Sequence, residues 1–156
     1  QFISMTETSG GKVVNAQKDD DLNVIIRKVY PDAKVIASNV PGIDASLNPD
    51  TVAEAQDLNG TDVGVVTGEI GVAENACVWV PQTMKEKSIC FISENLVILL
   101  HKNCIVDNMH EAYKSIHMTD YGFGSFISGP SKTADIEQSL VMGAQAARSV
   151  TIILID

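Results

Sequence analysis

The sequence predicts an α/β domain with a largely parallel sheet and helices on both of its faces. Short apolar segments alternate with segments of helical periodicity, and this alternation is typical of right-handed crossover units. The run at residues 96–100 is continuously apolar, as expected for a strand covered on both sides, and residues 150–155 are expected to form a last buried strand. With 156 residues the chain is too short for two ordinary domains. We therefore predict a single domain over residues 1–156.

In the first third of the chain, residues that begin and end helices delimit the expected elements. Asp19, Asp20 and Asp21 place negative charge where a helix over residues 23–29 would begin, and Pro31 follows its end. The further elements expected here are a strand over residues 34–37, a helix over residues 51–58 and a strand over residues 63–66.

In the rest of the chain, the apolar run at residues 96–100 is the clearest strand. Residues 104–106 are expected to pair beside it, and Asp107 or Asn108 is expected to cap a helix that reaches Ile116. The last expected elements are a strand near Phe126, a helix over residues 133–147 and a buried strand over residues 150–155.

Composition argues against two classes of partner. The chain carries 11 Lys and Arg against 20 Asp and Glu, a formal charge of -9, and its basic residues are scattered. A phosphate backbone or an anionic membrane surface needs clustered cations. No apolar run approaches the roughly 18 residues that span a bilayer. We expect neither nucleic acid nor a membrane as a partner.

Cysteine usage favours reduced thiols and no metal. Cys77, Cys90 and Cys104 are odd in number and lie in apolar surroundings, which suits buried thiols in a cytoplasmic protein better than a disulfide framework. The sequence has no Cys-x-x-Cys pair, the usual spacing of iron–sulfur and zinc ligands. His110 and His117 would share a helix face, but no third ligand accompanies them. We predict no bound metal or cofactor.

Residues 128–138 combine a tight turn with hydroxyl side chains and a lysine. Backbone N–H groups converge at such a strand–helix junction, and the positive end of the helix dipole lies there too, so the geometry suits an anion. Lys132 would add a mobile cation. The candidate ligand-binding residues of this segment are Ser128, Gly129, Ser131, Lys132, Thr133 and Asp135.

A purely structural role for the same segment is the alternative. Gly129 would make the turn, and Ser131 or Thr133 would cap the helix. Asp135 would then only offset the helix dipole in its first turn.

The same string, Ile-Ser-Gly-Pro-Ser-Lys-Thr-Ala-Asp-Ile-Glu at residues 127–137, resembles the signature of the lactate-utilisation (LUD) domain family. Residues 62–75, which include Thr67, Glu74 and Asn75, are similar to that family's strand and its Ala-Glu-Thr-Gly turn. The resemblance extends from about residue 62 to residue 156. Where related proteins carry a His-Gly-Pro turn after the signature, this chain has Gln145-Ala146-Ala147, so we expect no site role for that turn.

The resemblance implies a three-layer α/β/α fold of the kind shared by glucosamine-phosphate deaminase, ribose-phosphate isomerase and CoA transferases. Ligands of parallel sheets bind beyond the carboxyl ends of the strands. Thr67 follows the strand at residues 63–66, and the turn at Ser128 follows the strand near Phe126. We expect both to face one cleft.

Glu74 is the candidate catalytic residue. In an extended segment it would interrupt an apolar stripe that includes Val72 and Val78, and desolvation would raise its pKa toward the range of a general acid or base. CoA transferases of the related fold use a Glu as nucleophile. Asn75 could donate hydrogen bonds nearby. The alternative is that Glu74 lies in solvent or caps a turn after Gly71.

Three function classes compete. The resemblance favours a component of an L-lactate utilisation system, which oxidises lactate to pyruvate with iron–sulfur partner subunits and in which this chain binds a small anionic ligand. The second class is a stand-alone enzyme that acts on a sugar phosphate or an acyl-CoA, with Glu74 as base or nucleophile. The third is a ligand-sensing module of the same fold.

Overall fold

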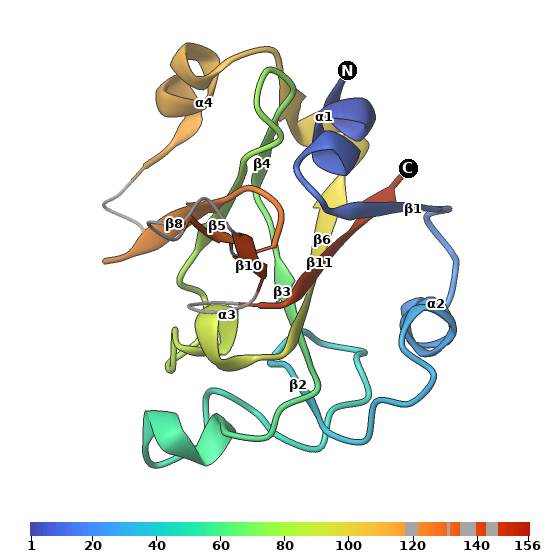
Figure 1. Ribbon diagram of the computed structural model, residues 1–156, viewed down its shortest axis with the longest axis vertical. Coiled ribbons are helices and arrows are strands. Elements are labelled where there is room, and N and C mark those ends of the chain that lie inside the picture. The colour runs from blue at the N-terminus through green and yellow to red at the C-terminus, as the bar shows by residue number, and fades with distance from the viewer. Residues whose placement is uncertain (118–121, 131, 135–139, 143–146) are drawn as a thin grey trace.

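The computed structural model describes residues 1–117, 122–130, 132–134, 140–142 and 147–156. Its largest element is a five-stranded sheet in the order β1-β11-β6-β3-β2, in which every neighbouring pair is parallel (Figure 1). The strands are β1 (Lys12–Ala16), β11 (Ser149–Ile155), β6 (Asn95–His101), β3 (Val63–Thr67) and β2 (Ile36–Ala37). The segments at residues 96–100 and 150–155 form β6 and β11, as predicted, and the two strands are neighbours in this sheet.

A smaller mixed sheet lies beside the parallel one. Its order is β7-β4-β5-β8, with β7 parallel to β4 and the other pairs antiparallel. The strands are β7 (Ile105–Val106), β4 (Ile70–Val72), β5 (Val78–Pro81) and β8 (Gly124–Ile127). The prediction that residues 104–106 pair beside β6 is therefore wrong, because Ile105 and Val106 find their partners in β4 instead.

Side chains of the parallel sheet alternate between two apolar clusters. On one face, Ile153 and Val97 pack with Ile26 of α2 (Leu22–Val29). On the other, Ile152 and Ile98 pack with Phe2 of α1 (Phe2–Thr8), with Ile89 of α3 (Ile89–Ile92) and with β5. α4 (Met109–Ser115) covers the small sheet in a third cluster. The parallel sheet is thus covered on both faces, as its apolar strands predict, but the small sheet forms much of one covering layer.

The expected helices at residues 23–29 and 108–116 are confirmed, and their caps explain where they begin. The Asp21 carboxylate accepts the Asn23 N–H, and the Asn108 side chain accepts the Glu111 N–H. These acceptors satisfy backbone donors that the first turn of a helix leaves free.

Two other expected helices are wrong. In place of a helix over residues 51–58, the structure has a single 3-10 turn, Ala55–Leu58. Within the expected helix at 133–147, β9 (Lys132–Ala134) and β10 (Leu140–Met142) form an antiparallel pair. Pairing between the two segments supplies backbone hydrogen bonds that a helix would make internally, so tertiary context overrides the helical spacing. Residues 135–139 and 143–146 lie outside the described chain.

Among the described residues, no helix has the length and apolar character needed to cross a bilayer.

Gly68 connects the two sheets, and we expect Gly68→Ala to lower the free energy of unfolding by about 1–3 kcal/mol. A Cβ at this position would lie 2.5 Å from Val78 Cγ1 and 2.9 Å from Ile98 Cγ2. Urea unfolding followed by circular dichroism measures the loss. Gly122→Ala is the control, because a Cβ there meets no atom within 4 Å. Equal stability of the two variants would contradict this packing.

Candidate functional site

The carboxyl ends of four parallel strands converge on a cavity of about 290 Å³. This is the edge of a parallel sheet where ligands bind in α/β proteins. We call it the carboxyl-edge cavity. Its lining residues follow β1 or β2, lie in the last residues of β3, β6 and β11, or begin α2; they are Gln17, Lys18, Asp20, Leu22, Val40, Thr67, Leu99, His101 and Ile155.

Three polar side chains at this cavity are exposed and suited to bind an oxygen-rich ligand. Thr67 is the last residue of β3, His101 is the last residue of β6, and Lys18 lies just after β1. Thr67 lies at the carboxyl end of β3, as its position directly after an apolar run predicts. Sequence reasoning missed His101 and Lys18, although His101 directly follows the apolar run at residues 96–100 and so carries the same signal.

The bottom of the carboxyl-edge cavity is apolar. Leu99 is 5% exposed and Ile155 is 8% exposed, and both belong to the cluster under α2. Leu22 and Val40 are half-buried and pack against the same cluster. A ligand here would meet polar groups at the rim and hydrocarbon below.

The acidic run at residues 19–21 borders this cavity, but two of its carboxylates are bonded to backbone groups. Asp20 Oδ2 accepts the Gln17 N–H at 2.8 Å, and Asp21 Oδ1 accepts the Asn23 N–H at 3.0 Å. The ion pairs of the described chain involve neither Lys18 nor His101. Lys18 therefore remains able to pair with an anionic ligand.

The structure brings two other predicted residues together, away from Thr67. Ser128 Oγ donates a hydrogen bond to the backbone oxygen of Asn75 at 2.9 Å, and the Asn75 side chain accepts the Cys77 N–H at 3.0 Å. Ser128 follows β8 of the small sheet, and the lining of the carboxyl-edge cavity includes none of Glu74, Asn75 and Ser128. Thr67 lines the carboxyl-edge cavity, and the expectation that Ser128 faces the same cleft stays a prediction.

Gly129 has a structural reason to be glycine. Its φ is +69°, in the region that L side chains rarely adopt, and a Cβ would lie 2.5 Å from the Ser9 backbone oxygen. Of the remaining loop candidates, Lys132 and Thr133 belong to β9, and Ser131 and Asp135 lie outside the described residues. Anion binding by this loop stays a prediction.

Glu74 does not interrupt an apolar stripe on a strand. It is exposed in the turn between β4 and β5, and its Oε2 accepts the Met109 N–H at 2.7 Å at the start of α4. A carboxylate at a helix N-terminus stabilises that helix, so Glu74 fixes α4 to the turn. Its catalytic role stays a prediction.

The Cys77 thiol beside this turn is a weak nucleophile. Burial raises its pKa above the ordinary value, a hydrogen bond with Ser128 opposes that shift, and the negative charge of Glu74 adds to it. Because the thiolate is the reactive form, a raised pKa slows reaction at neutral pH. The described residues also contain no group of three or more His, Cys, Asp or Glu side chains arranged to hold a metal ion.

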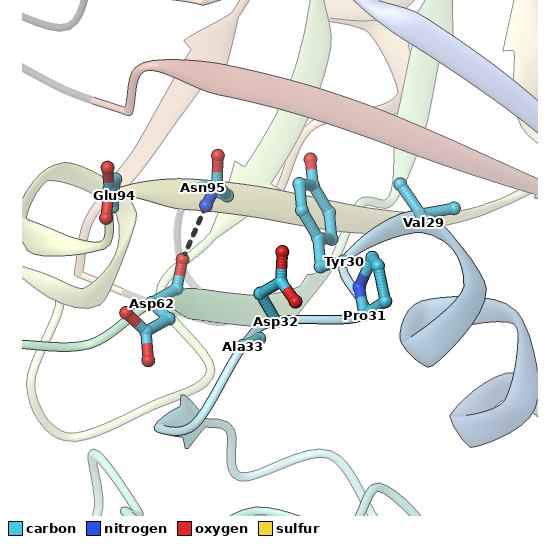
Figure 2. Close-up of a pocket in the computed structure, with 8 residues that line it drawn as sticks. All are labelled: Val29, Tyr30, Pro31, Asp32, Ala33, Asp62, Glu94 and Asn95. Carbon is cyan, nitrogen blue, oxygen red and sulfur yellow. Dashed lines mark hydrogen bonds between the residues drawn. The ribbon is translucent and has the colours of Figure 1, made fainter.

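A second cavity of about 290 Å³ lies at the opposite, amino edge of the sheet, where Asp32, Asp62 and Glu94 line it (Figure 2). Two of its polar side chains bond to the protein itself: Asn95 Nδ2 donates to the Asp62 backbone oxygen at 2.9 Å, as Figure 2 shows, and Tyr30 Oη is 2.7 Å from Ser149 Oγ. These contacts tie the beginnings of β3, β6 and β11 together.

Asp62→Asn is expected to destabilise the protein near neutral pH and less in acid. The Asp62 carboxylate accepts the Val35 and Lys34 N–H groups at 2.8 and 2.9 Å, and these bonds lower its pKa. A lowered folded-state pKa gives stability that is present above the unfolded value of about 3.9 and is lost as pH falls through the folded value. Urea unfolding near pH 7 and near pH 2.5 measures the difference.

Asp32→Asn is the matched control for this pH dependence, because Asp32 lines the same cavity. A loss for Asp62→Asn that is equal at both pH values would contradict the assignment to these two backbone bonds.

The comparisons with known proteins agree on one family. The LUD domain model matches residues 44–155. Proteins named lactate utilization protein C are similar: that of Oceanobacillus iheyensis is 30% identical over 121 residues, 72% of this chain and 50% of the relative, and that of Shouchella clausii is 28% identical over 123 residues, 74% of this chain and 53% of the relative. The chain spans about half the length of these curated relatives.

The fold also matches a solved structure. The crystal structure of a DUF162 family protein from Deinococcus radiodurans aligns with a TM-score of 0.75 and 11% sequence identity, and the alignment covers 99% of this chain and 94% of that one. This likeness concerns the fold alone. Since the LUD domain model covers more than half of the sequence, the chain belongs to the LUD domain family.

Proposed function

We propose that this protein is a component of a lactate-utilisation system that binds lactate or pyruvate in the carboxyl-edge cavity, while iron–sulfur partner subunits carry the electrons. The observation that carries the proposal is the LUD domain match over residues 44–155, together with relatives named lactate utilization protein C. The site geometry supports it, because polar groups gather at the edge of the sheet where such ligands bind.

Each polar group at the cavity suits one part of a 2-hydroxycarboxylate. The Lys18 ammonium has three N–H donors for a carboxylate, and charge-assisted hydrogen bonds of this kind are the stronger ones. The Thr67 hydroxyl and the His101 imidazole can each donate or accept, so they suit the hydroxyl of lactate and the oxo group of pyruvate.

Oxidation of lactate to pyruvate removes two electrons and two protons. In this proposal, the chain binds the acid and the partner subunits accept the electrons through iron–sulfur clusters. The sequence supports this division because it has no Cys-x-x-Cys pair. The turn at Glu74 and the loop after Ser128 form a second candidate site, for proton transfer by Glu74 and for anion binding by the loop.

Lys18→Gln is expected to weaken lactate binding about tenfold, the loss typical of one hydrogen bond to a charged group. Isothermal titration calorimetry with L-lactate and with pyruvate measures the effect. Lys12→Gln is the matched control, because Lys12 begins β1 at the opposite edge of the sheet and its loss changes the net charge equally.

Activity tests the role of the partners. The purified protein alone should not reduce a dye in the presence of lactate, whereas reconstitution with iron–sulfur subunits should. Glu74→Gln should depress the reconstituted rate if that carboxylate transfers a proton. Turnover of a sugar phosphate or an acyl-CoA by the isolated chain would contradict the proposal and establish the stand-alone enzyme instead.

A further inference from the structure

We infer that the carboxyl-edge cavity accepts 2-hydroxy and 2-oxo carboxylates whose side chains are longer than the methyl group of lactate. This inference rests on the proposed function for the polar end of the ligand only. The acceptance of a longer apolar side chain follows from the size and lining of the cavity.

The volume exceeds what lactate needs. A water molecule in the liquid occupies about 30 Å³, so a cavity of about 290 Å³ has room for roughly ten. Lactate held at Lys18, Thr67 and His101 would leave the lower part of the cavity to water.

The lower part of the cavity is hydrocarbon. Leu99 and Ile155 form its buried portion, and Leu22 and Val40 approach from α2 and from the segment after β2. Water there makes few hydrogen bonds, so a ligand methylene that displaces it gains free energy of transfer.

The orientation of the bound acid follows from the positions of the polar and apolar side chains of the cavity. Lys18, Thr67 and His101 are exposed at the rim, whereas Leu99 and Ile155 are buried. A bound acid would place its carboxylate and hydroxyl at the rim and its side chain toward Leu22 and Leu99. Leu22 is therefore a specificity-determining residue in this inference.

A chain-length series tests the inference. Affinities of lactate, 2-hydroxybutyrate, 2-hydroxyvalerate and 2-hydroxyhexanoate are measured by calorimetry on the full chain. Each added methylene should raise the affinity by about fourfold until the cavity is full, the gain expected for burying one methylene.

Leu22→Ala should reduce the gain in affinity per methylene, because it removes hydrocarbon that the side chain of the ligand would contact. Val24→Ala is the matched control: Val24 lies on the same helix, is 47% exposed and is not part of the cavity lining. Circular dichroism confirms that both variants are folded. The assignment is supported if each added methylene raises the affinity of Val24→Ala as much as that of the parent protein, and raises the affinity of Leu22→Ala less.

The outcomes separate this inference from the proposed function. If lactate binds but affinity does not rise with chain length, the inference is wrong and the proposed function stands. If only the longer acids bind, the inference stands and lactate is not the ligand. Binding of none of the acids would overturn both the cavity assignment and the inference.

Discussion

Trp79→Ala is expected to lower the free energy of unfolding by about 3–5 kcal/mol, the range for removing a buried aromatic ring. Trp79 is 6% exposed on β5, and its ring centroid lies 4.9 Å from that of Phe126 on β8. It also packs in one cluster with Ala112 of α4. Domains of this size are stable by only about 5–15 kcal/mol, so we expect the small sheet to lose much of its stability. Urea unfolding followed by far-UV circular dichroism measures the change.

Tyr113→Ala is the control for this aromatic cluster. The Tyr113 ring meets Phe126 edge-on at 5.8 Å but is 63% exposed. Surface substitutions usually change stability by no more than about 0.5 kcal/mol. If both variants lose the same stability, contact with Phe126 rather than burial would determine the effect, contrary to this argument.

The inner strands of the parallel sheet were predictable from sequence because their signals are local, whereas β1 (Lys12–Ala16) was not predicted. β6 contains the apolar run at residues 96–100, and residues 150–155 of β11 are apolar except for Thr151; such runs are typical of strands with two covered faces. Asp21 and Asn108 likewise predict helix starts within a few residues of where they occur. Such signals do not depend on knowing which distant segment lies alongside.

The small sheet depends on distant partners, so the sequence did not predict it. Val78 on β5 pairs with Ile127 on β8, and Gly71 on β4 pairs with Ile105 on β7. Strands of two to four residues carry too little periodicity to indicate which strand each one pairs with. The same cause misplaced Glu74: an extended segment was expected, but the chain turns between β4 and β5.

Of the candidate residues predicted from sequence, Thr67 lines the carboxyl-edge cavity. Thr67 follows from the rule that loops at the carboxyl ends of parallel strands bind ligands. His101 follows the apolar run of β6 and carries the same signal, whereas Lys18 carries no motif. Leu22 reaches the cavity from the start of α2, and Val40 reaches it from the segment after β2. The carboxyl-edge cavity is therefore a product of strand order, which a single sequence does not reveal.

Stability in alkali is expected to depend on Cys90. The thiol is 6% exposed on α3, and burial raises its pKa to about 12. An unfolded thiol has a pKa of about 8.5. At a pH between the two pKa values, the Cys90 thiol has lost its proton in the unfolded state and keeps it in the folded state. The free energy of unfolding then falls as pH rises, by about 1.4 kcal/mol per pH unit from this group alone.

The slope of stability against pH isolates the contribution of Cys90. Other thiols, tyrosines and lysines also titrate in this range, but they do so in both the parent and Cys90→Ala. The difference between the two slopes from about pH 9 to about pH 11 should therefore be about 1.4 kcal/mol per unit. Cys90→Ala also removes a buried sulfur. The packing lost in this way lowers the free energy of unfolding equally at every pH, so it does not contribute to the difference between the slopes. Parallel curves for the two proteins would mean that the folded thiol ionises as readily as the unfolded one, and that α3 does not shield it from water.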